Sequence, residues 1–273
     1  MIYIHQLNPT AFNLGGYLDV RWYGLMYIVG FAIAWLMGKQ SLRENQLITI
    51  STFSDLLNLS GLAVLVGGRL GYVLIYKWEA FIADPWLLFQ IREGGMSFHG
   101  ALITGILMCI HFSKNKGIGF FKLTDFIAPL IPPGLFFGRL GNFINAELYG
   151  KPTLQDWGVI FPNVDQKLRH PSQLYEMLGE GLLLGLILSL LKYRGSKNRR
   201  PGYLTSHFIM HYGWIRFFLE FFREPDWDIG YLSTSLTMGQ HLSLLMILAT
   251  ATTYYISTQY SKKTTLKTAH IGS

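Results

Sequence analysis

Charged side chains are scarce in this sequence. Asp, Glu, Lys and Arg make up 14% of the 273 residues, whereas about 25% is usual in soluble domains. Hydrophobic residues account for 50% and aromatic residues for 15%, so the composition predicts an integral membrane protein. The net charge of +7 would suggest nucleic-acid binding in a soluble protein. In so apolar a chain, sparse basic residues are better explained as topology signals, and we expect no nucleic-acid partner.

Several other features are missing. Cys109 is the single cysteine, so no disulfide can form within the chain. Residues 1–19 lack the basic start and apolar core of a cleavable signal peptide. His207 and His211 have a metal-compatible spacing, but no Glu stands between them as in zinc proteases. The aspartates lie in connections or at segment ends, and no glycine-rich nucleotide loop is present. These absences disfavour metalloproteases, intramembrane aspartyl proteases and nucleotide-binding enzymes.

Seven apolar segments dominate what the chain does contain. Most are close to the roughly 20 residues that a spanning helix needs, and the third is short. We therefore expect an all-α, polytopic membrane protein with seven transmembrane helices. The predicted helices are Trp22–Gln40, Phe53–Tyr76, His99–Phe112, Ile127–Ile144, Leu174–Leu191, Tyr203–Phe222 and Gly239–Ser257.

Basic residues set the predicted orientation of these helices. Most lysines and arginines follow the odd-numbered segments, which places the N-terminus outside and the C-terminus in the cytoplasm. The longest outer connection, residues 145–173, contains three prolines and is expected to form a small ordered extracytoplasmic cap. The polar and basic tail, residues 261–273, is expected to be mobile and cytoplasmic. No domain boundary is apparent, so residues 1–273 are interpreted as a single membrane domain.

Polar side chains from four predicted helices converge on the outer leaflet in this topology. Two arginines and a histidine there suggest a site for an anionic group, most simply a phospholipid phosphate, because planar guanidinium binds phosphate oxygens in pairs. A charge at such depth needs a partner or a function. The converging residues are Tyr23, His99, Arg139, Asn142, Glu147, Tyr212 and Arg216.

Structural explanations compete with these functional ones. Arg139 could pair with Glu147, and Arg216 with Glu220 one turn along its own helix. His99 alone is as often a hydrogen-bonded interface residue as a catalytic one. For the whole chain, the alternatives are an anion or lipid transporter and a purely structural membrane protein. A transporter predicts polar residues that continue to the cytoplasmic side and broken helices, whereas the fifth and seventh segments are predicted to be uninterrupted packing helices.

Six motifs stand out along the chain: Trp22–Tyr27, Gly67–Tyr72, Gly94–Gly100, Gly138–Gly150, His170–Glu176 and Tyr212–Arg223. In these motifs, which follow the family's order over nearly its whole length, the chain closely resembles the bacterial prolipoprotein diacylglyceryl transferases. The run from Gly138 to Gly150 is the most specific of them. One departure is Ala101, where the family commonly has a second glycine after the histidine. We expect this extra methyl group to alter helix packing only slightly.

The resemblance implies an inner-membrane enzyme that transfers the diacylglyceryl group of phosphatidylglycerol to the lipobox cysteine of a preprolipoprotein. It implies that Arg139 and Arg216 stabilise the leaving glycerol phosphate, and that His99 is the general base for the substrate thiol. The implied partners are phosphatidylglycerol, the signal peptide of the preprolipoprotein and membrane lipid, with the active site on the extracytoplasmic side. No metal or other cofactor is implied, because both reactive groups arrive on the substrates. The remaining substrate-binding residues are by resemblance Tyr23, Asn142, Glu147, Gly150 and Tyr212, with Arg69, Glu220 and Arg223 as further candidates.

Overall fold

The computed structural model describes residues 2–15, 18–90, 95–194, 199–225 and 236–271. Helices dominate the described chain, which divides into two compact units. The larger unit comprises Met1–Met37 and Asp125–Ser273, and the smaller unit comprises Gly38–Thr124.

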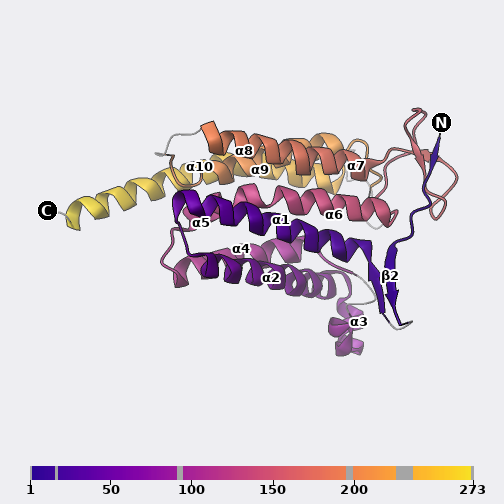
Figure 1. Cartoon of the computed structure of the whole chain (residues 1–273), viewed down its shortest axis with the longest axis horizontal. Coiled ribbons are helices and arrows are strands. Elements are labelled where there is room, and N and C mark those ends of the chain that lie inside the picture. Colours follow the sequence, from indigo (N-terminus) through magenta and orange to yellow (C-terminus); the bar gives the residue numbers. More distant parts are fainter. Residues whose placement is uncertain (1, 16–17, 91–94, 195–198, 226–235, 272–273) are drawn as a thin grey trace. The chain divides into compact units, whose positions relative to one another are not determined.

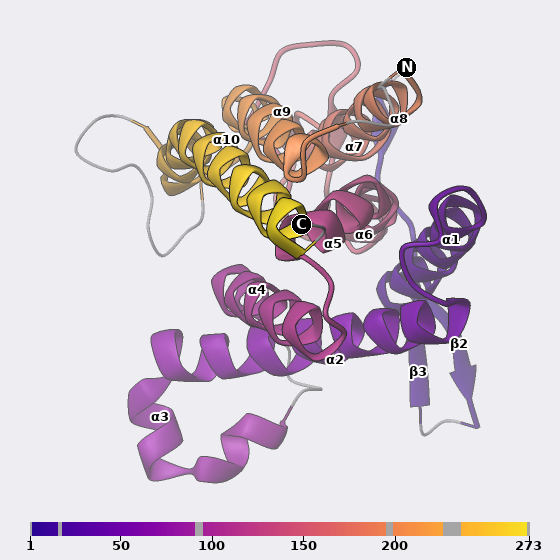
Figure 2. The ribbon, with the colours of Figure 1, turned by 90° about the vertical axis from the view of Figure 1, so that its left-hand side faces the viewer.

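The larger unit contains helices that lie side by side (Figures 1 and 2). Leu184 and Leu188 of the fifth predicted segment and Tyr212 of the sixth are buried against one another in its interior. Two helices, α1 and α5, begin in one unit and end in the other. The helices that lie wholly or partly in this unit are α1 (Trp22–Asn45), α5 (Phe120–Ile127), η3 (Ala128–Leu130), α6 (Pro132–Ile144), α7 (Ser172–Glu176), η4 (Met177–Leu183), α8 (Leu184–Arg194), α9 (Tyr203–Leu219) and α10 (Met238–Ile271).

The segment η4 is a π-helix that joins α7 to α8 without a break in the helical rod. It packs closely on α6 because Gly181 has no side chain: a Cβ atom there would lie 2.7 Å from the Cα of Phe136. Small residues permit such close approach between membrane helices. The glycine therefore sets the spacing between the two elements that carry Arg139 and Glu180.

Two small β-structures accompany these helices. β1 (Tyr3–Ile4) pairs in parallel with β4 (Val159–Ile160), which pairs antiparallel with β5 (Leu168–Arg169). β2 (Thr10–Leu14) and β3 (Leu18–Arg21) form an antiparallel hairpin that leads directly into α1. The N-terminal region thus contains three strands, which were not predicted. Their brevity explains why the sequence pattern did not reveal them, since two to five residues are too few to show an alternating period.

We call β1, β4, β5 and the connection of residues 145–171 the cap. It lies at the end of the bundle where α6 ends and α7 begins (Figure 1). Its core is formed by Phe143, Val159 and Phe161, against which the His5 ring packs. His5 also donates a hydrogen bond from Nε2 to the carbonyl oxygen of Phe143, over 2.8 Å. These contacts fasten the start of the chain to the end of α6.

The smaller unit is built on two packed helices, α2 (Ile50–Tyr76) and α4 (Phe98–Asn115), with α3 (Trp78–Ala83) and the short η1 (Pro85–Phe89) between them in sequence. The two helices approach closely at glycines: a Cβ on Gly71 would lie 2.7 Å from the Cα of Gly100. Such close approach requires small residues, so Gly71 and Gly100 have a structural role in helix packing.

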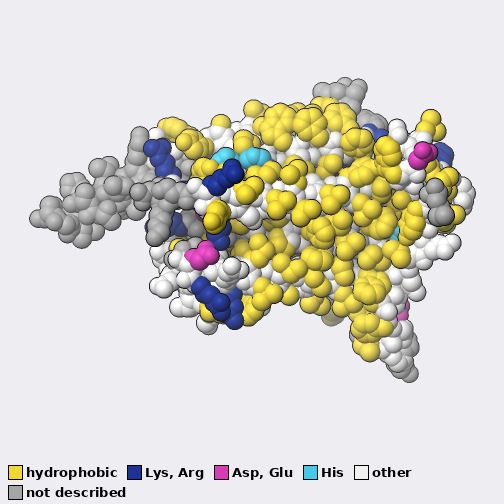
Figure 3. All heavy atoms as spheres, turned by 45° about the horizontal axis from the view of Figure 1, so that its top comes forward, with side chains coloured by type: hydrophobic (Ala, Val, Ile, Leu, Met, Phe, Trp, Pro, Cys, Tyr) yellow, Lys and Arg dark blue, Asp and Glu magenta, His cyan; other side chains and the backbone are white. Residues whose placement is uncertain are grey.

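All seven predicted segments are helical, but fewer meet a strict test for spanning a membrane. Three described helical stretches are long and apolar enough: Trp22–Glu44, Ile50–Tyr76 and Ser172–Arg194. A fourth is the pair Phe120–Leu130 and Pro132–Ile144, if the 41° bend between them is counted within one span. Hydrophobic side chains also cover most of the surface seen in Figure 3. The membrane character is supported, and the count of seven spans is not confirmed.

Two further expectations need correction. The fifth segment is not an uninterrupted α-helix, because η4 lies within it. The seventh continues beyond its predicted end at Ser257: α10 runs to Ile271 and so includes most of the polar tail, whose last residues, 272–273, lie outside the described residues.

Candidate functional site

A group of three arginines and three glutamates lies inside the larger unit. Its members come from α6, α7, η4 and α9 and from the turn after α9. All six side chains are largely shielded from solvent, and every one has at least one oppositely charged partner. We call this group the ion-pair cluster; it consists of Arg139, Glu176, Glu180, Arg216, Glu220 and Arg223.

Arg139 of α6 binds both carboxylates of the fifth segment. Its Nε lies 3.1 Å from Glu176 Oε2, and its Nε and Nη2 donate hydrogen bonds to Glu180 Oε2 over 3.2 and 3.1 Å. The contact with Glu176 is an ion pair without the alignment of a hydrogen bond. No partner of Nη1 is found among the described residues, so this nitrogen can still donate a hydrogen bond to a ligand.

Arg216 of α9 reaches the same two carboxylates from the other side. Its Nη1 donates to Glu176 Oε1 over 2.6 Å and to Glu180 Oε1 over 3.3 Å. Its Nη2 forms an ion pair with Glu220 Oε2 at 2.6 Å, which confirms the pairing expected one turn along the helix. Arg223 adds a longer contact of 3.5 Å from Nη1 to Glu176 Oε1. Glu176 is therefore shared by all three arginines.

Exposure differs between the two kinds of charge. The side chains of Glu176 and Glu180 are 0% exposed, whereas those of Arg139 and Arg216 keep 17% and 14%. A ligand that enters the cluster therefore meets guanidinium groups before it meets carboxylates. The buried carboxylates offset the high cost of placing cations in an apolar surrounding and also hold the guanidinium planes in place.

The loop after α6 presents Glu147 beside this cluster. Its carboxylate is exposed and accepts hydrogen bonds from Asn142 Nδ2 over 3.4 Å and Asn145 Nδ2 over 3.3 Å. The expected pairing of Glu147 with Arg139 is not what the structure shows, because Arg139 turns towards Glu176 and Glu180. The helical spacing places Arg139 on the side of α6 that faces η4.

The backbone around Glu147 is strained and firmly held. The residues on both sides, Ala146 and Leu148, have a φ of 55°, a left-handed conformation that is uncommon outside glycine. Gln173 Nε2 donates to the carbonyl oxygen of Glu147 over 2.7 Å, and Ser172 Oγ donates to that of Leu148 over 2.9 Å. Strain of this kind persists where the surroundings impose it, often at functional sites. The motif from His170 to Glu176 thus fixes this loop and also supplies Glu176.

Gly150 is a structural junction at the end of the same loop. Its amide donates to the carbonyl oxygen of His170 over 2.9 Å, and Arg169 Nη1 donates to its carbonyl oxygen over 3.0 Å. A Cβ atom would collide with the His170 carbonyl oxygen and would lie 2.7 Å from that of Phe222. Gly150 also forms a β-bridge with Arg223, so it joins the loop to the ion-pair cluster.

Two tyrosines flank the charged residues. The hydroxyl group of Tyr23 lies 3.1 Å from that of Tyr27, and Tyr23 is within electrostatic range of Glu147 and Arg139. Tyr212 is buried against α8 and is within electrostatic range of Glu180 and Arg139. The structure therefore brings both predicted tyrosines to the same site.

His99 and Arg69 belong to the smaller unit. His99 lies in the first turn of α4, directly after its N-cap Ser97, and is half-buried. Arg69 is buried, and its guanidinium donates to the carbonyl oxygens of Leu87, Leu88 and Gly95. These bonds hold the connection after α2, which gives Arg69 a structural role. The expected convergence of His99 with the predicted site, and substrate binding by Arg69, stay predictions.

Two cap histidines have pKa values lowered by burial. His5 and His170 both lie outside the membrane-spanning segments, and loss of water around the charged imidazolium lowers the pKa of each below 6.5. The neighbouring ion pair of Asp165 with Arg169, 2.7 Å long, has the opposite character. Its hydrogen bond lowers the pKa of Asp165 below 3.8, so this carboxylate stays charged at neutral pH.

Glu176 and Glu180 were not predicted as members of the site. Glu176 is the last residue of the motif His170–Glu176, and Glu180 lies outside all six motifs. Both stand four residues apart in an otherwise apolar segment. Because ionisable residues inside membrane helices usually have a partner, this spacing was the available signal.

The chain is similar to known proteins over most of its length. A sequence model of the family described as prolipoprotein diacylglyceryl transferase matches residues 9–256. Three relatives carry the name phosphatidylglycerol--prolipoprotein diacylglyceryl transferase. The protein from Bordetella parapertussis is 47% identical over 257 residues, 93% of this chain and 97% of the relative. Those from Aeromonas salmonicida and Oleidesulfovibrio alaskensis are 48% and 44% identical, over 90% and 98% of this chain and 88% and 100% of the relatives.

Proposed function

The chain belongs to the prolipoprotein diacylglyceryl transferase family, and from this premise we propose that its ion-pair cluster binds the headgroup of phosphatidylglycerol. The protein is a transferase that moves a diacylglyceryl group from phosphatidylglycerol to a prolipoprotein in lipoprotein maturation. The observation that carries the proposal is the partial exposure of Arg139 and Arg216 over fully buried carboxylates.

The proposed reaction takes place at the cysteine of the lipobox in the preprolipoprotein. The thiolate attacks the glyceryl carbon that bears the phosphate, a C–S bond forms, and the C–O bond to the phosphate breaks. The products are a thioether and glycerol phosphate, and the thiol proton passes to a base. Negative charge grows on the departing phosphate, so fixed donors directed at it lower the barrier. Arg139 Nη1 is such a donor, because its other nitrogens are held by Glu176 and Glu180.

The charge balance of the cluster supports its proposed role in stabilising the leaving phosphate. Three arginines face three glutamates, so the cluster is formally neutral before a ligand enters. A neutral, preorganised cluster binds the singly charged phosphodiester of the substrate less strongly than the more highly charged phosphate of the leaving group. Binding that strengthens towards the transition state is what accelerates a reaction.

The strained loop forms the second wall of the proposed site. The exposed Glu147 carboxylate and the Asn142 amide are suited to bind the hydroxyl groups of the glycerol headgroup, because they offer an acceptor beside a donor. Tyr23 and Tyr212 complete this wall with their hydroxyl groups. Gly150 and Arg223 shape the site through the backbone, and Glu220 orients Arg216.

His99 is the proposed base for the substrate thiol. A thiol has an ordinary pKa of about 8.5, so it needs deprotonation to become a strong nucleophile at neutral pH. His99 is half-buried in the first turn of α4, so part of its side chain stays accessible to a substrate. Replacement of His99 by Gln is expected to abolish transfer and to keep phosphatidylglycerol binding. Unchanged turnover in this variant would exclude His99 as the base.

The finer membrane arrangement belongs to the same proposal. We place the enzyme in the bacterial inner membrane with seven spanning helices, the N-terminus outside and the C-terminus in the cytoplasm. The cap then faces the extracytoplasmic side, as does the ion-pair cluster next to it.

Mass spectrometry tests the proposed chemistry directly. The purified protein is incubated with phosphatidylglycerol and a peptide that contains one lipobox cysteine. We expect a diacylglyceryl mass increment on the cysteine and an equal amount of released glycerol phosphate. A matched peptide with Ser in place of the cysteine is expected to stay unmodified. Modification of the Ser peptide, or of the cysteine without release of glycerol phosphate, would contradict the proposal.

A further inference from the structure

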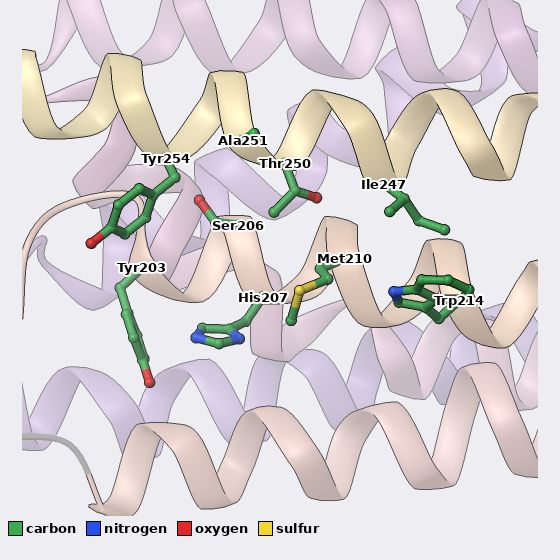
Figure 4. Close-up of a pocket in the computed structure, with 9 residues that line it drawn as sticks. All are labelled: Tyr203, Ser206, His207, Met210, Trp214, Ile247, Thr250, Ala251 and Tyr254. Carbon is green, nitrogen blue, oxygen red and sulfur yellow. The ribbon is translucent and has the colours of Figure 1, made fainter.

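A groove of about 420 Å³ lies between α9 and α10 in the larger unit (Figure 4). Its α9 wall includes Tyr203, His207, Met210 and Trp214, which recur at the spacing of one helix face. Arg216 follows Trp214 by two residues and therefore points about 200° around the helix from it. The groove is thus a feature of the opposite face of α9, separate from the ion-pair cluster.

The length of the groove matches one leaflet of a bilayer. Tyr203 and Tyr254 lie at one end, and Trp214 and Ile247 lie at the other (Figure 4). From Tyr203 to Trp214 the helix rises by about 16 Å, and half of a hydrocarbon core is about 15 Å thick. Its lining between the two ends is mostly apolar, with Met210 and Ala251 on opposite walls. The shape therefore suits a single extended acyl chain.

Two buried nitrogen atoms at the Tyr203 end have no hydrogen-bond partner in the described chain. His207 Nδ1 is buried, and no hydrogen-bond partner is found for it in the part of the chain that the structure describes. Arg199 lies next to Tyr203, with its guanidinium carbon 5.6 Å from the centre of that ring. The buried Nε of Arg199 also has no partner among the described residues, whereas its Nη2 donates to the carbonyl oxygen of Lys192. Two unsatisfied nitrogens at one end of an apolar groove indicate an anionic ligand.

We propose that this groove binds one acyl chain of an anionic membrane phospholipid, whose phosphate is held at the Tyr203 end by Arg199 and His207. Because lipid tails are as apolar as the groove, the chain gains only close packing there. Selectivity must therefore come from the charged end, as in other basic pockets between membrane helices. The site lies about 20 Å along α9 from Arg216 at its polar end, so it is a second lipid site and not part of the transfer site.

Photolabelling tests whether an acyl chain occupies the groove. The full-length protein is placed in phosphatidylcholine vesicles that contain a small share of phosphatidylglycerol with a photoreactive acyl chain. We expect label within residues 203–214 and 247–254. Ala251→Trp fills the groove and should lower this label about tenfold. Leu248→Trp is the matched control, because Leu248 is 70% exposed and does not line the groove. Both variants should retain diacylglyceryl transfer, which shows that they are folded.

A second comparison tests the charged end. The same measurement with photoreactive phosphatidylcholine should give several-fold less label, and Arg199→Gln should remove this preference. The proposal is overturned if Ala251→Trp is labelled as strongly as the unsubstituted protein. It is also overturned if both lipids label the groove equally, or if the groove residues cross-link to a second copy of the chain and carry no lipid label.

Discussion

Arg139 illustrates how a single buried charge can have both a partner and a function. Two of its nitrogens, Nε and Nη2, bind Glu176 and Glu180, and the third nitrogen, Nη1, remains for a ligand. The carboxylates make the buried cation tolerable, and they also fix the direction of the free donor. Removal of Arg139 alone therefore has two consequences, since it deletes a ligand contact and leaves two buried carboxylates short of positive charge.

Glu176 allows the structural side of this arrangement to be measured. Glu176→Gln should lower the free energy of unfolding by about 3–5 kcal/mol, because three arginines lose a shared and fully buried counter-charge. The measurement is the midpoint of unfolding of the detergent-solubilised protein, followed by far-ultraviolet circular dichroism.

The matched control is Glu224→Gln, which removes the partner of Arg169 in the cap. Glu224 is 41% exposed and pairs with Arg169 at 3.1 Å, so its loss should cost at most about 1 kcal/mol. Equal shifts in the two variants would show that burial does not govern the strength of these ion pairs.

At the scale of elements, the contact between η4 and α6 sets the distance between Glu180 and Arg139 of the ion-pair cluster. A Cβ atom at Gly181 would collide with the backbone of Phe136. Gly181→Ala should therefore push the two elements apart, reduce the unfolding midpoint and lower transfer activity. The effect on activity is expected because small displacements of catalytic groups are costly.

Gly134 provides the control for this substitution on α6. A Cβ atom at Gly134 would have no heavy atom within 4 Å, and alanine favours a helix by up to about 1 kcal/mol over glycine. Gly134→Ala should leave activity intact and keep or raise the unfolding midpoint. If both alanine variants behave alike, the close approach at Gly181 is not important for the site.

The cap should respond to pH through its two buried histidines. The pKa values of His5 and His170 are lowered below 6.5 in the folded state. As the pH falls below 6.5, the unfolded chain binds protons first, so the free energy of unfolding decreases in that direction. Asp165 does not contribute between these pH values, because its pKa lies below 3.8 and its carboxylate stays charged there. Backbone hydrogen exchange at Val159 and Ile160, corrected for intrinsic rates, should become faster between about pH 7 and about pH 5.

A double variant isolates the histidine contribution to the cap. His5→Asn with His170→Asn should flatten the pH dependence of hydrogen exchange, even if it raises exchange at all pH values. An unchanged pH profile in this variant would show that other groups cause it.

Elements were predictable from the sequence to very different degrees. Long apolar runs located the seven main helical segments, because a membrane helix needs about 20 such residues, but they did not reveal that α5 begins at Phe120. The strands β1 and β4 are two residues long and depend on pairing between distant segments, so no local sequence pattern predicts them. The π-helix η4 was also invisible, since its sequence has the same apolar character as its neighbours. The pairing of Arg216 with Glu220 was predicted, but Glu176 and Glu180 were not predicted as counter-ions of Arg139 and Arg216.

At the scale of the whole molecule, the orientation in the membrane can be tested with single cysteines. In a Cys109→Ser background, Gln155→Cys in the cap and Lys116→Cys after α4 both place a thiol at an exposed position. A membrane-impermeant maleimide added to intact spheroplasts should label Gln155→Cys and not Lys116→Cys. Permeabilised cells should show label at both positions. The reverse pattern in intact cells would invert the proposed topology.

The whole molecule also shows where a sequence stops being informative. Resemblance named Tyr23, Asn142, Glu147, Arg216 and others together, and the larger unit indeed brings these residues near one another. The resemblance alone did not reveal that the cluster is charge-balanced, because this property depends on which side chains face each other across α6, η4 and α9. His99 lies in the smaller unit, and its role in the reaction stays a prediction.

The most direct test of the account is a charge-balanced double variant, Arg139→Gln with Glu180→Gln. Arg139→Gln alone should lose both stability and transfer, because it removes one of the cations that pair with the buried Glu176 and Glu180 and leaves these carboxylates to Arg216 and Arg223. The double variant removes one charge of each sign, so its unfolding midpoint should return close to that of the unsubstituted protein. Transfer of the diacylglyceryl group to a lipobox peptide should nevertheless stay about 100-fold or more below normal. Restoration of normal transfer in the double variant would contradict the central claim, since Arg139 would then serve only to neutralise Glu180.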